Sequence, residues 1–294
     1  MGGRAVASIL ALCAVMATAG EARAGDGDAV TDAPLRWDES HPRFRPGEYA
    51  FTGVTGLFAL WEYFFLPSTV NPRWTGGILF DDAVHDVLRV SNPSALRTIS
   101  TASDIVGSSE VALTVGIDSM LVPVARGSFD VAWQLTWFDL EAYALGSVAT
   151  FTLYDTIGRA RPAYSDCPAS SRAAGSCGVS PGASFPSGHV AESFISAGLS
   201  CANHAYVPLY GGGFWDGFAC ARDVTLAMAD GVLRIMGDRH WATDVLAGGG
   251  LGFAFGYAMP VLLHYRVGAG RRGPGISLAP MGNDRVGLVA TGVF

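Results

Sequence analysis

Apolar residues recur at helical spacing along most of the chain, and polar stretches divide them into separate elements. The stretch 50–66 is strongly apolar and holds one internal carboxylate, Glu62. Its length suits a buried helix and is marginal for a membrane span. A short amphipathic pattern follows at 81–90, and acidic residues interrupt the helical spacing at 94–124. The latter pattern predicts a helix pair with one buried face.

The second half of the chain predicts four more helices. An aromatic-rich helix covers 131–154 and should end at Pro162, because proline cannot continue a helix. After a loop dense in small residues, helices are expected at 187–206, at 221–236 and from about 241 to 265.

The two ends of the chain differ from this helical part. The segment 25–49 is polar and Pro-rich, with no helical or strand period, which predicts an extended leader. Apolar and polar residues alternate at 276–279 and again at 285–294, which predicts a short hairpin. We therefore expect one helical domain at 50–266 and a tail at 267–294.

Residues 1–24 have the features of a secretory signal peptide. Arg4 precedes an apolar run at 5–19, and Ala22-Arg23-Ala24 forms a small-x-small cleavage site. The alternative is a genuine N-terminal membrane helix. The signal-peptide interpretation predicts a mature chain outside the cytoplasm.

In an oxidising compartment the cysteines are expected to form disulfides. Removal of the signal peptide removes Cys13 and leaves four cysteines, which allow three pairings. The two sequence-local pairs, Cys167–Cys177 and Cys201–Cys220, are the simplest choice.

The charge pattern narrows the range of partners. The formal net charge is -7, and the chain contains no lysine, so all 19 basic residues are arginines. No basic run offers a footprint for a nucleic-acid backbone, so a nucleic-acid partner is not expected. Cationic chemistry in this chain must use arginine or histidine.

A tight turn at 185–189 presents Ser187, Gly188 and His189 just before a predicted helix. On its own, such a serine is usually a helix N-cap. The serine hydroxyl, the glycine N–H and the positive end of the following helix can also bind an anion. His189 could then protonate a leaving oxygen.

Two basic clusters flank this turn. Arg161 precedes it and Arg234 follows it, and two guanidinium groups would compensate most of the charge of a phosphate dianion. Each arginine could instead cap a helix C-terminus. His240 and Asp244 are four residues apart, so on a helix they would share a face and the carboxylate could orient the imidazole as a nucleophile or base. A surface ion pair is the alternative for these two residues.

The three clusters together resemble the three-part signature of the type 2 phosphatidic acid phosphatase and vanadium haloperoxidase superfamily, and the likeness covers about 50–265. The resemblance implies an all-α fold, a bundle of about six core helices followed here by the short β-like tail. It also implies a phosphohistidine mechanism. His240 would attack phosphorus, Asp244 would orient it, and His189 would protonate the departing alcohol. The phosphoryl oxygens would be bound by Arg161, Arg234, Ser187 and the Gly188 amide.

Two positions depart from the family pattern. The lysine that opens the first motif is Tyr154 here, and the serine that usually precedes the arginine of the third motif is Leu233. The first change removes a phosphate-binding cation. Arg159 could reach round to replace it, because a long side chain tolerates some displacement, or it could face solvent.

The resulting expectation is an extracytoplasmic phosphoric monoester hydrolase that needs neither a metal nor a cofactor. Its substrate would be a lipid phosphate or a small soluble ester, and its oligomeric state is left open. Two alternatives remain at this stage. One is a vanadate-dependent haloperoxidase, with His240 ligating vanadium. The other, motivated by Tyr154, is a degenerate phosphate or phospholipid binder.

The sequence also bears on whether the bundle is embedded in a membrane. Only 245–263 offers a charge-free apolar run of spanning length, and the helix from 221 carries four charges that are costly in lipid. A Cys201–Cys220 bond would be unlikely to persist in a cytoplasmic loop. These points favour a periplasmic bundle that is soluble or rests on a membrane surface over one embedded in the membrane.

Overall fold

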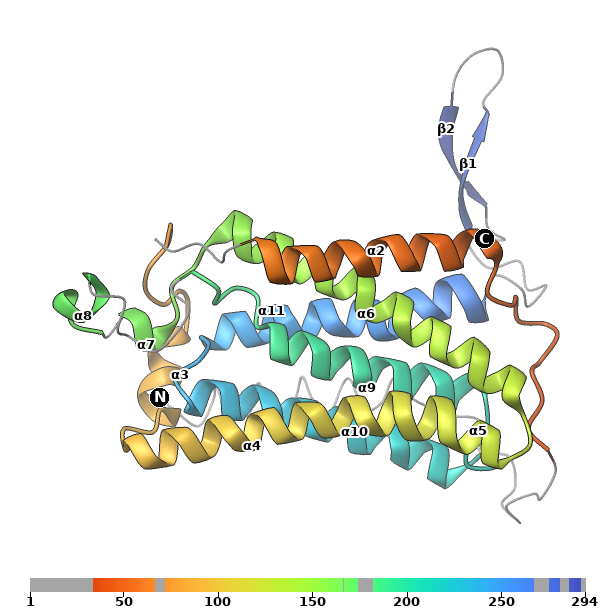
Figure 1. Cartoon of the computed structure of the whole chain (residues 1–294), viewed down its shortest axis with the longest axis horizontal. Helices are drawn as coiled ribbons and strands as arrows, with labels where there is room; N and C mark the ends of the chain where they lie inside the picture. Colours follow the sequence, from red (N-terminus) through yellow and green to blue (C-terminus); the bar gives the residue numbers. More distant parts are fainter. Residues whose placement is uncertain are drawn as a thin grey trace.

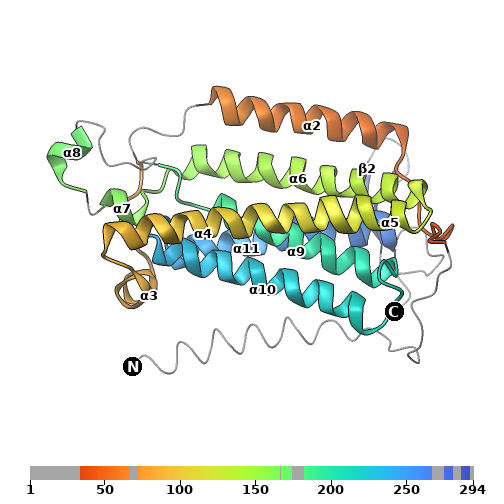
Figure 2. The ribbon, with the colours of Figure 1, turned by 60° about the horizontal axis from the view of Figure 1, so that its bottom comes forward.

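The long helices lie side by side with roughly parallel axes, and the short helices α3, α7 and α8 lie at one end (Figure 1). Figure 2 shows the same bundle turned, with α2 on the outer side of α6. The computed structural model describes residues 34–66, 72–165, 167–173, 182–266, 275–280 and 286–291. The predicted signal peptide at 1–24 and most of the first half of the leader lie outside these ranges.

The described part of the chain confirms the all-α prediction. Its long helices are α2 (Pro46–Phe65), α4 (Pro93–Val111), α6 (Phe129–Ile157), α9 (Gly188–Tyr206), α10 (Phe214–Met236) and α11 (Ala242–Phe253). The short helices are α3 (Asp81–Leu88), α7 (Pro162–Ser165) and α8 (Ala169–Ala173). Two π-helical stretches, η2 (Ala254–Ala258) and η3 (Val261–Tyr265), extend α11. The tail forms an antiparallel hairpin of β1 (Gly275–Pro280) and β2 (Val286–Thr291).

The predicted helix pair at 94–124 is wrong, because this part of the chain is one continuous helical rod. From α4 it runs through the π-helical η1 (Ala112–Leu121) into α5 (Val122–Ala125). Two of its acidic residues, Glu110 and Asp118, are on the inner face with no exposed surface, whereas Asp104 is exposed.

Some helix ends also differ from the expectations. The α10 helix begins at Phe214, well before the predicted position 221, and α2 begins at Pro46. The α6 helix ends at Ile157, because Gly158 adopts a left-handed conformation with φ of 60°. This early end releases Arg159 and Arg161 from the helix and places them in the loop beside the bundle end.

The central helix is α9, which packs against α4, α6, α10 and α11. Its contact with α11 and with η2 is close because three glycines face its backbone, Gly248 and Gly252 of α11 and Gly256 of η2. A methyl group on any of them would collide with a backbone carbonyl oxygen of α9. Such spacing of small residues allows two helix backbones to approach each other. The N-terminal ends of α9 and α11 are therefore held together.

The bundle has a polar interior and an apolar exterior. Six of its buried carboxylates are Glu110, Asp118, Asp139, Glu141, Asp223 and Asp230. The exposed side chains at 51–66, 105–125, 214–232 and 246–263 include many large apolar ones, and no charged side chain is exposed in these four ranges. We call these exposed residues the apolar belt. Within the described chain, Pro93–Ala125 and Ala242–Tyr265 are long and apolar enough to span a membrane.

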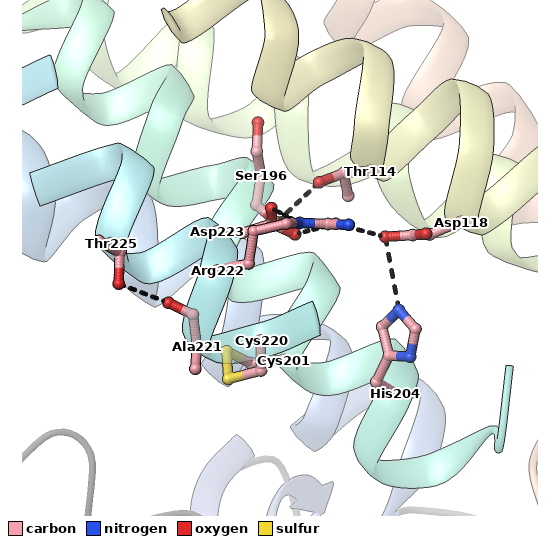
Figure 3. The surroundings of a disulfide bond; sticks show 10 residues. All are labelled: Thr114, Asp118, Ser196, Cys201, His204, Cys220, Ala221, Arg222, Asp223 and Thr225. Carbon is pink, nitrogen blue, oxygen red and sulfur yellow. Dashed lines mark hydrogen bonds and ion pairs between the residues drawn. A yellow bond between two sulfur atoms is a disulfide. The ribbon is translucent and has the colours of Figure 1, made fainter. Parts of the chain in front are cut away.

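A disulfide joins α9 to α10, as predicted, between Cys201 and Cys220 (Figure 3). Ionic contacts beside it reach η1. The Asp118 carboxylate lies 3.1 Å from Nη2 of Arg222 and 3.4 Å from Nε2 of His204. These links tie three helical segments together near the end of the bundle opposite α3, α7 and α8. The Cys167–Cys177 pairing stays a prediction, because Cys177 lies outside the described residues.

Candidate active site

His240 lies in the short connection between α10 and α11, with no exposed surface. Its Nδ1 lies 2.8 Å from the carbonyl oxygen of Ser184. A carbonyl oxygen only accepts, so Nδ1 carries the proton and Nε2 keeps its lone pair. Nε2 is buried and has no hydrogen-bond partner. Burial, followed by the positive charges of Arg161 and Arg234, holds the pKa of His240 well below its usual range. The ring is therefore neutral and nucleophilic at neutral pH.

Asp244 does not contact His240 in the predicted way. The two residues do not share a helix face, because α11 begins only at Ala242, and the carboxylate lies 3.9 Å from Nδ1 of His240. Instead Asp244 accepts hydrogen bonds from the Ser184 hydroxyl at 2.6 Å and from the Trp241 amide at 2.9 Å. Ser184 thus connects the carboxylate to the imidazole, and the sequence motifs did not indicate this residue.

Arg159 is fully buried, so the solvent-facing alternative for it is wrong. Its Nη1 donates to Asp244 and its Nη2 to Asp81, both at 2.6 Å. The guanidinium also lies over the ring of Trp74, with its central carbon 4.3 Å from the ring centroid, and 5.4 Å from that of Trp241. Both ends of Arg159 are occupied by carboxylates, so the geometry favours a role in fixing Asp244 over phosphate binding.

The other two arginines line the space around His240. The Nε of Arg161 donates to the carbonyl oxygen of Ala183 at 3.2 Å, and burial lowers the pKa of Arg161 to about 10. Arg234 is only 4% exposed, and its Nε has no hydrogen-bond partner. Its Nη1 lies 3.3 Å from the carboxylate of Asp104, a residue of α4 that the motifs did not indicate. A buried and a half-buried cation with few partners are costly unless an anion joins them.

The turn at 185–189 lies at the N-terminal end of α9. Ser187 is the residue before the helix, and its hydroxyl oxygen is buried without a hydrogen-bond partner. The Gly248 backbone lies against that of Ser187, as described for the α9–α11 contact. His189 is at the edge of the site, with 47% of its side chain exposed, and its Nε2 lies 3.3 Å from Asp104.

Tyr154 takes the place of the family lysine and lies close to the turn. A methyl group on residue 188 would collide with the Tyr154 hydroxyl oxygen, so a larger residue there would require the tyrosine side chain to shift. The phenol therefore brings a hydrogen-bonding group to the Gly188 region, although it brings no positive charge at neutral pH.

The structure thus brings the predicted residues Arg161, Ser187, His189, Arg234 and His240 to one end of the bundle. Three of them present buried polar atoms without partners. No group of three or more His, Cys, Asp or Glu side chains in the described ranges has a geometry that could hold a metal ion.

Comparison with protein families found one match, over residues 136–267, to the model of the PAP2 superfamily. The match is consistent with a type 2 phosphatidic acid phosphatase-like protein and confirms the resemblance that the three motifs indicated. Neither a curated protein nor a solved structure matches the chain.

The PAP2 range includes the predicted site residues from Arg159 to Asp244 and the position of Tyr154. Two contributors to the site, Asp81 and Asp104, precede it. The match to the superfamily model supports a phosphatase-like function in general, with a phosphorylated substrate.

Proposed function

We propose that this protein is a phosphoric monoester hydrolase with His240 as its nucleophile. One observation carries the proposal. Three buried polar atoms from three segments lack hydrogen-bond partners: Nε2 of His240, Oγ of Ser187 and Nε of Arg234. Buried polar groups in folded proteins are rarely left unpaired, so each such atom calls for an explanation. A tetrahedral phosphate would supply oxygen acceptors to the serine and the arginine, and a phosphorus atom to the histidine.

In the first step Nε2 of His240 attacks phosphorus and the bond from phosphorus to the ester oxygen breaks. The electron pair of that bond goes to the leaving oxygen, which takes a proton from His189 to give an alcohol. In the second step water attacks the phosphohistidine, His189 accepts its proton, and inorganic phosphate is released with His240 restored. The reaction is balanced with one water consumed.

Phosphate binding would rest on Arg161, Arg234, the Ser187 hydroxyl and the Gly188 amide. Two guanidinium groups offset most of the charge of a phosphate dianion, and their planar forks suit its oxygens. The α9 N-terminus adds the positive end of a helix. Ser187, Gly188 and Arg234 are buried before substrate arrives, so little reorganisation opposes the charge that develops in the transition state.

Asp244 would act through Ser184 as a positioning residue. Its carboxylate fixes the Ser184 hydroxyl, and the carbonyl oxygen of the same residue fixes the proton of His240 on Nδ1. The attacking lone pair on Nε2 is thereby kept available.

Rapid quench with labelled aryl phosphate tests this function. Wild-type protein should accumulate an acid-labile phosphoenzyme, and His240→Asn should give none. His189→Asn should still form it from an aryl phosphate, whose leaving group needs no proton, and should lose turnover of an alkyl phosphate. Phosphate binding without any turnover by the wild type would identify a binding protein and refute the hydrolase.

We further propose that the bundle is embedded in a membrane of the cell envelope. The apolar belt surrounds the bundle on α2, on the α4 rod, on α10 and on α11, whereas a bundle resting on a membrane surface would need only one such face. The site residues lie beyond the belt, at the end of the bundle. The buried carboxylates point inward, as ionisable groups in membrane bundles do.

The disulfide is compatible with this location. Cys201 and Cys220 lie within α9 and α10 and not in the loop between them. The bond therefore does not report the compartment of that loop.

Alkaline carbonate extraction tests the embedding, with retention in the membrane pellet expected. Phe218 belongs to the belt and is 48% exposed, and an arginine in its place should impair insertion by about 2.5–3.5 kcal/mol if the site is deep in lipid. Thr98→Arg is the matched control, because Thr98 is exposed beyond the belt. Release of the wild-type protein into the carbonate supernatant would refute the proposal.

A further inference from the structure

One oxygen of Asp104 contacts two residues of the proposed catalytic site. Oδ1 of Asp104 lies 3.3 Å from Nη1 of Arg234 and 3.3 Å from Nε2 of His189. One of these groups would bind a phosphoryl oxygen, and the other would protonate the ester oxygen. Oδ1 of Asp104 therefore lies between the two donors, in the space that an oxygen of the substrate would occupy.

The partners of this contact differ in their freedom to move. Arg234 is 4% exposed and held within the bundle, whereas 58% of the Asp104 side chain is exposed. An exposed carboxylate can turn into water at little cost, because such ion pairs contribute little net free energy. Phosphate and carboxylate both accept from the same guanidinium donors, and two anions at one guanidinium repel each other.

We propose that Asp104 is a positioning residue that holds Arg234 and His189 in the empty site and is displaced when the substrate phosphate binds. The proposal rests on the phosphatase function proposed above. In the free enzyme the carboxylate orients the two donors towards the open side of the site. The substrate then replaces Oδ1, and the proton on Nε2 of His189 passes from its contact with Asp104 to the leaving oxygen.

The contact with Asp104 affects the protonation of His189, because the other charges near this histidine are mostly positive. Burial, followed by the positive charge of Arg234, lowers the pKa of His189, while Asp104 raises it. Nearly half of the ring side chain is exposed, so water weakens the effect of burial and the neighbouring charges carry more weight. The ionisable groups that face this part of the site are Tyr154 of α6, Arg161 of the following loop, Glu192 of α9, Asp230 and Arg234 of α10, and Arg239 and His240 of the loop before α11.

The test uses Asp104→Asn in the full-length protein, with two readouts. Calorimetric titration with inorganic phosphate at pH 7 should show a Kd about two- to fivefold lower than that of the wild type, because the competing anion is gone. In the pH profile of kcat for an alkyl phosphate, the fall in rate at alkaline pH should begin about one pH unit lower than in the wild type. The reason is that His189 loses a neighbouring negative charge, which lowers its pKa. Asp104→Glu keeps the charge and should restore the limb.

Asp86→Asn is the matched control, because Asp86 is exposed on α3 away from these contacts, and both readouts should stay at wild-type values. Weaker phosphate binding by Asp104→Asn would overturn the proposal, since it would mean that the carboxylate supports the bound anion. An unchanged Kd together with an unchanged alkaline limb would also overturn it. If the wild type has no turnover, the hydrolase function fails, while the phosphate titration still decides whether Asp104 competes with the anion.

Discussion

His240 donates its Nδ1 proton to the carbonyl oxygen of Ser184 at 2.8 Å, and so the orientation of the proposed nucleophile depends on the backbone of a serine. The hydroxyl of the same serine donates to Asp244 at 2.6 Å. A carboxylate and an imidazole that do not hydrogen-bond to each other are thereby connected through one residue.

Ser184→Ala should lower kcat about tenfold and leave KM nearly unchanged. The carbonyl oxygen remains, but the backbone loses its attachment to Asp244, and a small displacement of the nucleophile slows attack. Steady-state kinetics with an aryl phosphate measures the effect. Ser200→Ala is the control, because the Ser200 hydroxyl is buried in α9 and lacks a hydrogen-bond partner. Equal kinetics for the two variants would show that Ser184 does not position His240.

Asp244→Asn and Asp81→Asn should both destabilise the fold, because each leaves the buried Arg159 with one carboxylate. Breaking a buried ion pair in this way lowers the free energy of unfolding by about 3–5 kcal/mol. The two variants should differ in kcat when they are compared at a temperature at which both are folded. Only Asp244→Asn disturbs Ser184, so it should lose more of kcat. Thermal unfolding followed by circular dichroism, with kinetics at low temperature, provides both measurements.

Tyr154→Lys should increase the affinity for inorganic phosphate about tenfold at pH 7, because a charged donor replaces a neutral phenol beside Gly188. Turnover should rise with it. Tyr154→Phe separates the charge from the hydroxyl and should bind phosphate no more tightly than the wild type. If the lysine variant gains no affinity, a cation at position 154 does not reach the anion.

The free energy of unfolding should decrease as the pH is lowered below about 6.5, partly because of His240. The pKa of this residue is held well below its usual range in the folded protein, so the unfolded chain binds a proton there that the folded protein does not. Stability therefore rises with pH in this window, and His240 contributes a slope of about 1.4 kcal/mol per pH unit. Melting temperatures in detergent between pH 4.5 and 7.5 should show a shallower slope for His240→Asn.

The helical spacing of apolar residues predicted the helices and their order, because amphipathic periodicity reports which face is buried. It fails at 94–124, where Glu110 and Asp118 interrupt the apolar spacing although the helix continues through them. Buried carboxylates are rare in the core of an ordinary soluble protein, so a pattern with acidic residues indicates a face exposed to water. Here that face is the buried one. The residue type alone does not say whether a charge faces water or the interior of a bundle.

The motifs identified the residues that the bundle brings together, but not how they are connected. Arg161, Ser187 and Arg234 carry recognisable chemistry in the sequence, whereas Ser184 acts partly through its backbone and has no signature. Asp104 lies far from the motifs along the chain and reaches the site only through the packing of α4 on α9 and α10. Arg159 could not be assigned, because its two carboxylate partners come from different segments.

The three glycines of α11 and η2 that face the α9 backbone affect how a substrate reaches the site. At these three positions no side chain separates the two backbones, so we expect the wall formed by the Ser187 turn and the start of α11 to resist opening. We expect the movement that admits a substrate on the other side, where α4 carries the exposed Asp104. The phosphate-binding half of the site should behave as a rigid template, and any slow step of opening or product release should be sensitive to substitutions on α4 and insensitive to those on α11.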